Sequence, residues 1–384
     1  MTAAGIGTEA PADAPVRARL VGPDVTRAVA LIGVVVMNYH GYLNGSAAAA
    51  QPGDQWAAQL FDPWTGVLST RFASTFMLVA GVGVALLTER AAAADRAGAP
   101  SSHALDADRW RLVRRGTLLY GFGFVLDWIW PGTILFYYGA AFVIAALIVP
   151  LRSRWIASIG ATAALAAAAL NWWAVARGER GESPAWLLSP GTLETRSPRG
   201  LVLDTFVNGT HPMLPWLAFM CAGIVLGRRI RSLPMLRTAA IGAGLVAATY
   251  VISHIATSGH ADDPVRLAVF STSPFDRGLL YTLNALGSAV AAFCVISWLT
   301  GRHPGSLVVR VLQVAGQTTL SLYVLHVLYF NLVVNTWYWV TPTGLDTALA
   351  LAITFWAAAI TLAWWWRRRF PLGPLEVAYR RFGG

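Results

Sequence analysis

Long apolar segments recur along the chain, and they constrain its fold more than any other feature. We place about ten of them, at residues 24–43, 64–88, 111–128, 131–150, 154–175, 211–228, 235–256, 277–300, 315–337 and 345–366. A helix needs about 20 apolar residues to cross the hydrocarbon core of a bilayer, which is close to the length of most of these segments. The sequence therefore predicts an all-α fold, a polytopic transmembrane helical bundle of about ten helices.

The composition excludes an ordinary soluble domain. Hydrophobic residues make up 56% of the chain and charged residues only 12%, a balance typical of polytopic membrane proteins. The net charge of +10 comes from arginines in short loops between apolar segments, so we expect no nucleic-acid partner. The two cysteines, Cys221 and Cys294, lie within apolar segments and predict neither a disulfide framework nor a metal site.

Arginine is concentrated in alternate loops, which predicts the orientation of the bundle. Placing the N-terminus in the cytoplasm puts most arginines on the cytoplasmic side, so we expect both termini inside and a multi-pass protein of the plasma or inner membrane. The Ala- and Pro-rich opening has no signal-peptide core and predicts a disordered cytoplasmic tail. The expected organisation is a tail (1–20), one transmembrane domain (21–369) with outer loops at 44–63, 176–210 and 257–276, and a cytoplasmic C-terminal tail (370–384).

The first apolar segment carries polar residues at both ends. Asp24 and Arg27 are three residues apart and share a helix face. Arg27 and Asn38 are separated by three helical turns, so they lie on one stripe about 16 Å apart. This pattern predicts a charged site near one membrane surface and an amide near the other.

Arg71 lies within the second apolar segment, and an ionisable group at membrane depth indicates a functional site. We expect it about 10 Å below Trp64, from the helical rise over seven residues. Its expected partners are Asp62 or Asp127. The alternative is an arginine that extends back to the membrane interface without a functional partner.

Three histidines fall on the predicted outer half of the bundle, and histidine suits general-base chemistry near neutral pH. His40 closes the first segment, His211 opens the sixth, and His326 lies near the middle of the ninth. Thr319, Tyr323 and His326 follow helical spacing and form one polar stripe. Any one of these histidines alone suits a structural role equally well. Together they predict an outer catalytic site shared with Asn38, Asp62 and Arg71.

Charged residues also gather at the cytoplasmic mouths of the first and third segments. The guanidinium group of arginine matches phosphate oxygens in shape and charge. We expect an anion site, with coenzyme A phosphates as its ligand, at Asp24, Arg27, Arg114 and Arg115. The alternative is a general attraction of these arginines to anionic lipid.

Several short motifs occur in order along the chain: Asp24-Val-Thr-Arg27 with Asn38, Phe72 to Leu87, Gly132 to Tyr138, His211-Pro-Met-Leu-Pro-Trp216, Gly316 through Tyr323 to His326, and Gly373-Pro-Leu-Glu376. Together they resemble motifs of the YeiB-like and heparan-α-glucosaminide N-acetyltransferase families of transmembrane acyltransferases. The chain departs from these families where Ala28 follows Arg27 in place of glycine, and where residues 61–64 contain no histidine before the tryptophan.

The resemblance implies transfer of an acyl group, most simply acetyl, from cytosolic acyl-CoA to a hydroxyl or amine. The acceptor would be sugar-like, lipid-linked or a small molecule. In this interpretation His40 or His326 is the base and Asp62 orients it. Asn38 or Arg71 then stabilises the oxyanion. Direct transfer and an acyl-histidine intermediate are both open.

Two other functions fit the same polar residues. A transporter or exporter would use the polar stripe as a substrate path, although the sequence shows no internal repeat of the kind common in such proteins. A lipid-binding scaffold leaves Arg71 and His326 without a role. We expect membrane lipids as partners and no metal cofactor, and a homodimer stays open as an oligomeric state.

Overall fold

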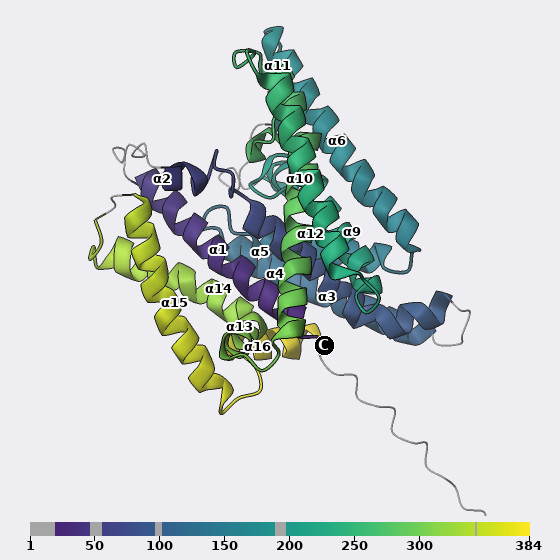
Figure 1. The fold of residues 1–384 in the computed structure, drawn as a ribbon, viewed down its shortest axis with the longest axis vertical. Helices are drawn as coiled ribbons and strands as arrows, with labels where there is room; N and C mark the ends of the chain where they lie inside the picture. Colours follow the sequence, from purple (N-terminus) through teal and green to yellow (C-terminus); the bar gives the residue numbers. More distant parts are fainter. Residues whose placement is uncertain (1–19, 47–55, 97–101, 189–196, 342–343) are drawn as a thin grey trace, which may run out of the picture.

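The computed structural model describes residues 20–46, 56–96, 102–188, 197–341 and 344–384 (Figure 1). Within these ranges the chain is helical and has no strand. The elements in chain order are α1 (Val21–Ser46), α2 (Trp56–Leu60), α3 (Arg71–Arg96), α4 (Ser102–Leu126), α5 (Leu135–Ile148), α6 (Ser153–Glu179), α7 (Ala185–Leu188), α8 (Pro198–Leu203), η1 (Asp204–Asn208), α9 (Met213–Arg229), α10 (Met235–Thr257), α11 (Pro264–Phe270), η2 (Pro274–Asp276), α12 (Leu279–Arg302), α13 (Leu307–Gln317), α14 (Thr319–Phe330), η3 (Asn331–Thr336), α15 (Leu345–Arg367) and α16 (Pro374–Gly383).

The predicted transmembrane helical bundle is confirmed. Among the described residues, 7 helices are long and apolar enough to cross a membrane, or up to 8 if the bent pair Pro198–Asn208 and Met213–Arg229 forms one broken span. The predicted segment 131–150 produces a shorter apolar helix, Leu135–Ile148. A second shorter apolar helix, Leu307–Gln317, lies largely before the predicted segment 315–337. The chain is thus a multi-pass membrane protein.

Helix α1 lies in the middle of the bundle (Figure 1). It packs against α3, α12, α13, α14 and α15. Helices α3 and α9 approach closely at Gly81 and Gly223, where an added Cβ would overlap the facing backbone. Small residues allow such contacts between membrane helices. Helix α3 in turn packs against α1, which carries Arg27 and Asn38.

The second helix begins later than we expected. Residues 61–70 form turns, and α3 starts at Arg71 rather than at residue 64. The Asp62 carboxylate accepts hydrogen bonds from the backbone N–H groups of Trp64 and Thr65, and Thr70 has a φ of 60°. Both features end helical geometry before Arg71. Arg71 is therefore the first residue of its helix and does not lie seven residues deep in it.

A turn joins the third and fourth predicted segments. Helix α4 ends at Leu126 and α5 begins at Leu135. Gly132 has a φ of 80°, which glycine adopts without strain. Its N–H donates to Asp127 Oδ1 at 2.8 Å, so the carboxylate stabilises the turn.

The ninth predicted segment is not one continuous helix. It divides into the end of α13, then α14 and η3, with a break at Thr318. The break leaves backbone N–H groups at the start of α14 without helical partners. The break lies beside α1. The two segments pack so closely there that an added Cβ on Gly316 would overlap the Asp24 carbonyl.

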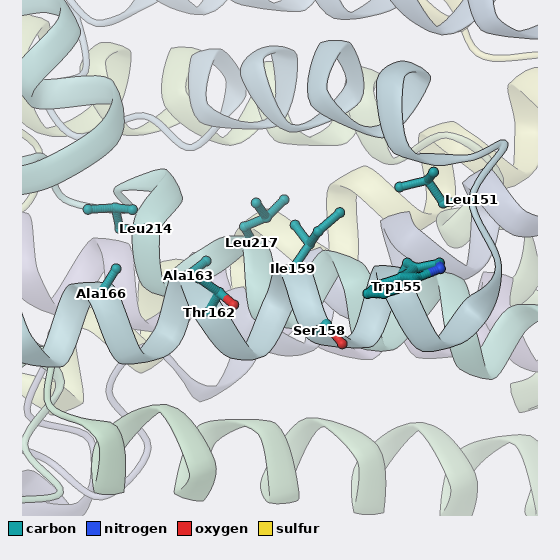
Figure 2. A pocket seen from close by; sticks show the side chains of 9 residues that line it. All are labelled: Leu151, Trp155, Ser158, Ile159, Thr162, Ala163, Ala166, Leu214 and Leu217. Carbon is teal, nitrogen blue, oxygen red and sulfur yellow. The ribbon is translucent and has the colours of Figure 1, made fainter.

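A shallow apolar groove of about 550 Å³ lies between α6 and α9 (Figure 2). Its lining is hydrocarbon from Leu151, Trp155, Ile159, Leu214 and Leu217, together with two alanines and the hydroxyl groups of Ser158 and Thr162. Its chemistry matches that of a surface in contact with lipid chains.

Candidate functional site

Two cavities lie inside the bundle along α1. The first, which we call the basic cavity, has a volume of about 520 Å³ and includes Arg27, Arg115 and Arg380 in its lining. The second, the aromatic cavity, has a volume of about 640 Å³. Both volumes fall within the range of about 300–1,000 Å³ that is usual for small-molecule sites.

The basic cavity has a charged mouth and an apolar interior. Arg27 comes from α1, Arg115 from α4, and Tyr379 and Arg380 from α16. The apolar part comes from α3, α4, α5 and α14, with side chains that include Phe76, Val84, Leu112, Leu119, Leu135, Phe142 and Leu320. Such a cavity suits an amphiphile with an anionic head.

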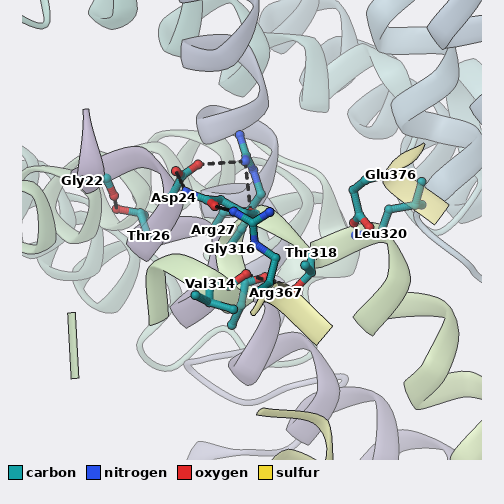
Figure 3. Close-up of polar contacts among 12 residues, drawn as sticks. Gly22, Asp24, Thr26, Arg27, Val314, Gly316, Thr318, Leu320, Arg367 and Glu376 are labelled. Atoms are coloured by element: carbon teal, nitrogen blue, oxygen red, sulfur yellow. Dashed lines mark hydrogen bonds and ion pairs between the residues drawn. The ribbon is translucent and has the colours of Figure 1, made fainter. Parts of the chain in front are cut away.

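Arg27 is positioned by a polar network at the start of α1 (Figure 3). One of its nitrogens lies 3.5 Å from Asp24 Oδ1 and 3.3 Å from the Gly316 carbonyl. Gln317 donates to Asp24 Oδ2 at 3.1 Å, and Arg367 donates to Gln317 Oε1 at 2.8 Å. The Asp24 side chain is 6% exposed and that of Arg27 is 25% exposed. Asp24 is therefore buried next to Arg27 and positions it, while Arg27 itself lines the cavity.

The other two arginines predicted for the anion site, Arg115 and Arg114, occupy different positions relative to the basic cavity. Arg115 lines the basic cavity, donates to the Gly384 carbonyl at 3.0 Å and lies 5.5 Å from the centre of the Tyr379 ring. Burial raises the pKa of the Tyr379 hydroxyl above its usual range, so this hydroxyl stays neutral. Arg114 is exposed and is absent from the cavity lining.

Sequence reasoning missed the contribution of α16, which we placed in a tail. Glu376 Oε1 accepts hydrogen bonds from the N–H groups of Leu320 and Ser321, at 2.8 and 3.1 Å. Its Oε2 accepts from the Ser321 hydroxyl at 2.5 Å. These N–H groups are the ones that the break at Thr318 leaves free, and a carboxylate is favourable at a helix N-terminus. The Gly373-Pro-Leu-Glu376 motif thus fixes the start of α14 and brings Arg380 to the cavity.

The aromatic cavity presents ring faces and neutral polar groups. Its rings come from Tyr42, Trp64, Phe72, Trp130, Phe275 and Phe330, and its polar groups from Asn38, Thr70, Thr210, His211, Tyr323 and Asn335. Tyr42 stacks on Trp130 with 3.7 Å between ring centres, and Trp64 lies 5.2 Å from Phe275.

Asn38 and His326 are brought together as the sequence predicted for one site. Asn38 Nδ2 lies 3.3 Å from His326 Nε2. The other ring nitrogen, Nδ1, faces the Tyr323 carbonyl, so Nδ1 carries the proton and Nε2 accepts from the amide. His326 is fully buried and lines neither cavity, whereas Asn38 lines the aromatic cavity. His326 therefore orients Asn38 in this structure.

His211 occupies the wall of the aromatic cavity. Its ring packs edge-on against Trp216 at 4.5 Å and Tyr137 at 5.6 Å between ring centres. Its Nδ1 is buried and has no hydrogen-bond partner among the described residues. Of the three predicted histidines, it is the one that lines a cavity within the described part of the chain.

His40 and Asp62 lie apart from both cavities. His40 is 2% exposed, and its Nδ1 lies 2.8 Å from the Phe61 carbonyl. The Asp62 carboxylate accepts from the N–H groups of Trp64 and Thr65, at 2.9 and 2.6 Å. Neither residue belongs to a cavity lining, and no hydrogen bond between them is present in the described structure.

Arg71 has different partners from those we expected. Its guanidinium donates to the carbonyls of Ser69 and Thr272, both at 3.3 Å, and lies 5.2 Å from the Tyr281 ring centre. Among the described residues it forms no ion pair with Asp62 or Asp127. Its place at the start of α3 puts it against the 272–281 segment, where the Thr272 carbonyl and the Tyr281 ring stabilise its charge.

Tyr323 connects the two cavities. It is the one residue among those described that lines both of them. Its hydroxyl lies 3.0 Å from Thr133 Oγ1 and accepts from the Ile134 N–H at 3.2 Å. Its ring lies 4.7 Å from that of His326. The spacing of Thr319, Tyr323 and His326 was the sequence signal for this position, but it did not indicate a boundary between cavities.

Metal ligation has no support in the described residues, which contain no group of three or more His, Cys, Asp or Glu side chains that could hold an ion. Cys221 and Cys294 are buried and free.

Comparison with known families gives two matches. Residues 19–259 match the family described as heparan-alpha-glucosaminide N-acetyltransferase, catalytic. Residues 231–383 match a family described as a protein of unknown function, DUF418. No curated protein matches the chain. Arg27, Asn38, Arg115 and His211 come from the first match and Tyr323, Glu376 and Arg380 from the second, so both matched parts build the two cavities.

Proposed function

Because the chain belongs to the family of the heparan-α-glucosaminide N-acetyltransferase catalytic domain, we propose that it transfers an acyl group from acyl-CoA in the basic cavity to an acceptor in the aromatic cavity. The family indicates membrane acetyltransferase activity, which makes acetyl the expected acyl group. The observation that carries the proposal is the arrangement of the cavities: one is cationic, the other is aromatic and neutral, and both meet at Tyr323.

The basic cavity suits the donor. Arg27, Arg115 and Arg380 supply guanidinium groups for phosphate oxygens, and the apolar interior suits the uncharged arm that carries the thioester. The bias of arginine toward one set of loops supports a cytosolic mouth for this cavity, with both chain termini inside. The donor is then drawn from the cytosol.

The aromatic cavity suits the acceptor. Ring faces stack on the C–H faces of sugars and similar molecules, while Asn38, Thr70 and Thr210 offer hydrogen bonds to hydroxyl groups. A sugar-like, lipid-linked or small-molecule acceptor with a hydroxyl or amine fits this lining. It enters from the side opposite the arginines or from the membrane.

We assign the base to His211 and the amide contact to Asn38. The acceptor oxygen or nitrogen attacks the thioester carbonyl carbon, and His211 takes the proton that the acceptor loses. The C–S bond then breaks, and the coenzyme A thiolate leaves and is protonated. Asn38, held by His326, hydrogen-bonds the acceptor or the developing oxyanion. Direct transfer needs no covalent enzyme intermediate, and an acyl-histidine at His211 is the alternative route.

Purified protein in detergent or nanodiscs tests the proposal. Acetyl-CoA should raise the melting temperature, because a ligand that binds only the folded state stabilises it by about 2.7 kcal/mol at 100 times its Kd. Radiolabelled acetyl should move to an acceptor in a panel of hydroxyl and amine compounds. A transporter would be indifferent to every acyl-CoA in both assays, and that result would overturn the proposal.

A further inference from the structure

We infer that Tyr323 is the partition between donor and acceptor and that its ring limits the length of the acyl group. This inference rests on the proposed function. It adds the residue that determines the acyl substrate class, which is then a short, uncharged acyl group.

The position of Tyr323 makes it the end wall of the basic cavity. It lies seven residues beyond Gly316, whose carbonyl contacts Arg27. The break at Thr318 lies between them, so Tyr323 stands on α14 while the residue that contacts Arg27 stands on α13. Between the two ends the wall is apolar, with Val84, Leu119 and Leu135 among its side chains. A donor held by its phosphates at Arg27 therefore directs its uncharged end toward the tyrosine ring.

Tyr323 is held at both its side-chain and its backbone end. Its hydroxyl bonds to Thr133 and to the Ile134 N–H, which belong to the turn before α5. Its backbone carbonyl holds His326, which in turn holds Asn38. The side chain is almost fully buried, at 3% exposure. The same residue thus closes the basic cavity and supports the amide of the aromatic cavity, so a short acyl group that reaches the ring lies beside Asn38.

Acyl-CoA substrates of increasing length test the inference. Wild-type protein, Tyr323→Phe, Tyr323→Ala and the control Tyr42→Ala would be assayed with acetyl-, butyryl-, hexanoyl- and octanoyl-CoA. Tyr42 lines the aromatic cavity alone and leaves the partition in place. The readout is the ratio of kcat/KM for acetyl-CoA to kcat/KM for octanoyl-CoA.

Wild-type protein should favour acetyl over octanoyl by at least about tenfold, in line with the discrimination that steric pockets achieve. Tyr323→Ala should lower this ratio by at least about tenfold, because the two cavities merge. Tyr323→Phe keeps the ring and should retain the wild-type ratio, as should Tyr42→Ala. An unchanged ratio in Tyr323→Ala would overturn the inference.

A second measurement does not depend on turnover. Ala73 lines the aromatic cavity, so Ala73→Cys reports access to it in a background that lacks Cys221 and Cys294. A membrane-impermeant thiol reagent should label this cysteine from one side only, and from both sides once Tyr323 is Ala. One-sided labelling in Tyr323→Ala would overturn the partition. If Tyr323→Ala is labelled from both sides but the protein with Tyr323 intact transfers no acyl group, the partition stands. The proposed function is then rejected, and the acyl-length limit with it.

Discussion

Asn38 on α1 and His326 on α14 meet with 3.3 Å between the amide nitrogen and the ring Nε2. The contact joins residues that are 288 positions apart in the chain. It leaves the histidine with both ring nitrogens engaged and leaves the amide in the cavity wall. In the proposed reaction, Asn38 is the residue that contacts substrate and His326 is the residue that positions it.

We predict that Asn38 and His326 act as one unit. Asn38→Ala leaves the buried His326 Nε2 without its partner, which costs about 1–3 kcal/mol of stability. It also removes the amide from the aromatic cavity, so turnover should fall at least tenfold. The double variant Asn38→Ala/His326→Ala should lose less stability than the sum of the single variants, as measured by denaturant unfolding. Simple additivity would contradict a direct interaction.

His211→Ala should reduce kcat by about 100-fold or more, which is the usual contribution of a general base. Its folded yield should fall only modestly, since Nδ1 has no protein partner among the described residues and the loss is confined to ring packing on Trp216 and Tyr137. The matched control is His40→Ala. That variant should lose stability of about 1 kcal/mol with the bond to Phe61 but keep its activity per folded molecule. The reverse pattern would return the role of base to His40.

Arg115 and Arg114 form a matched pair for the donor site, because they are adjacent in sequence and only the first lines the basic cavity. Arg115→Ala should raise KM for acetyl-CoA by about 10- to 100-fold, given 1.5–3 kcal/mol for a hydrogen bond to a charged group. Arg114→Ala should leave KM within about twofold of wild type. Steady-state kinetics with varied acetyl-CoA would show the difference. Equal effects would indicate a general surface charge.

Glu376→Ala should destabilise the protein by about 0.5–2 kcal/mol, the range found for lost helix caps. The reason is the loss of hydrogen bonds to Leu320, Ser321 and the Ser321 hydroxyl. Glu89→Ala is the control, since its 4.0 Å pair with Arg231 is partly exposed and contributes about 0–1 kcal/mol. Thermal unfolding in one detergent compares the two. Equal melting temperatures would mean that α16 does not fix α14.

The fold class was predictable because hydropathy over about 20 residues is a local property that the bilayer imposes. Arg27 and Asn38 were predictable for a similar reason, since one helix carries both and its rise sets their distance. Helix breaks were harder to predict. The turns before Arg71 and the interruption at Thr318 depend on the side chains of Asp62 and Glu376, and the second of these lies 58 residues away from the break it stabilises.

The arrangement of the site depended on contacts that no single segment reveals. His40 and His211 looked equivalent in sequence, because both lie at the predicted outer side of an apolar segment. The structure distinguishes them through partners: Phe61 occupies a ring nitrogen of His40, whereas Nδ1 of His211 has none among the described residues. Arg71 was misplaced because its helix begins later than its hydropathy suggests.

The docking of α16 has a consequence for how the protein is made. Every other described helix is synthesised before α16, and Glu376 reaches back to the start of α14. While translation is in progress, the segment with Tyr323 and His326 therefore enters the membrane before its carboxylate cap exists. A nascent chain therefore cannot assemble the complete lining of the basic cavity until α16 has folded back onto α14.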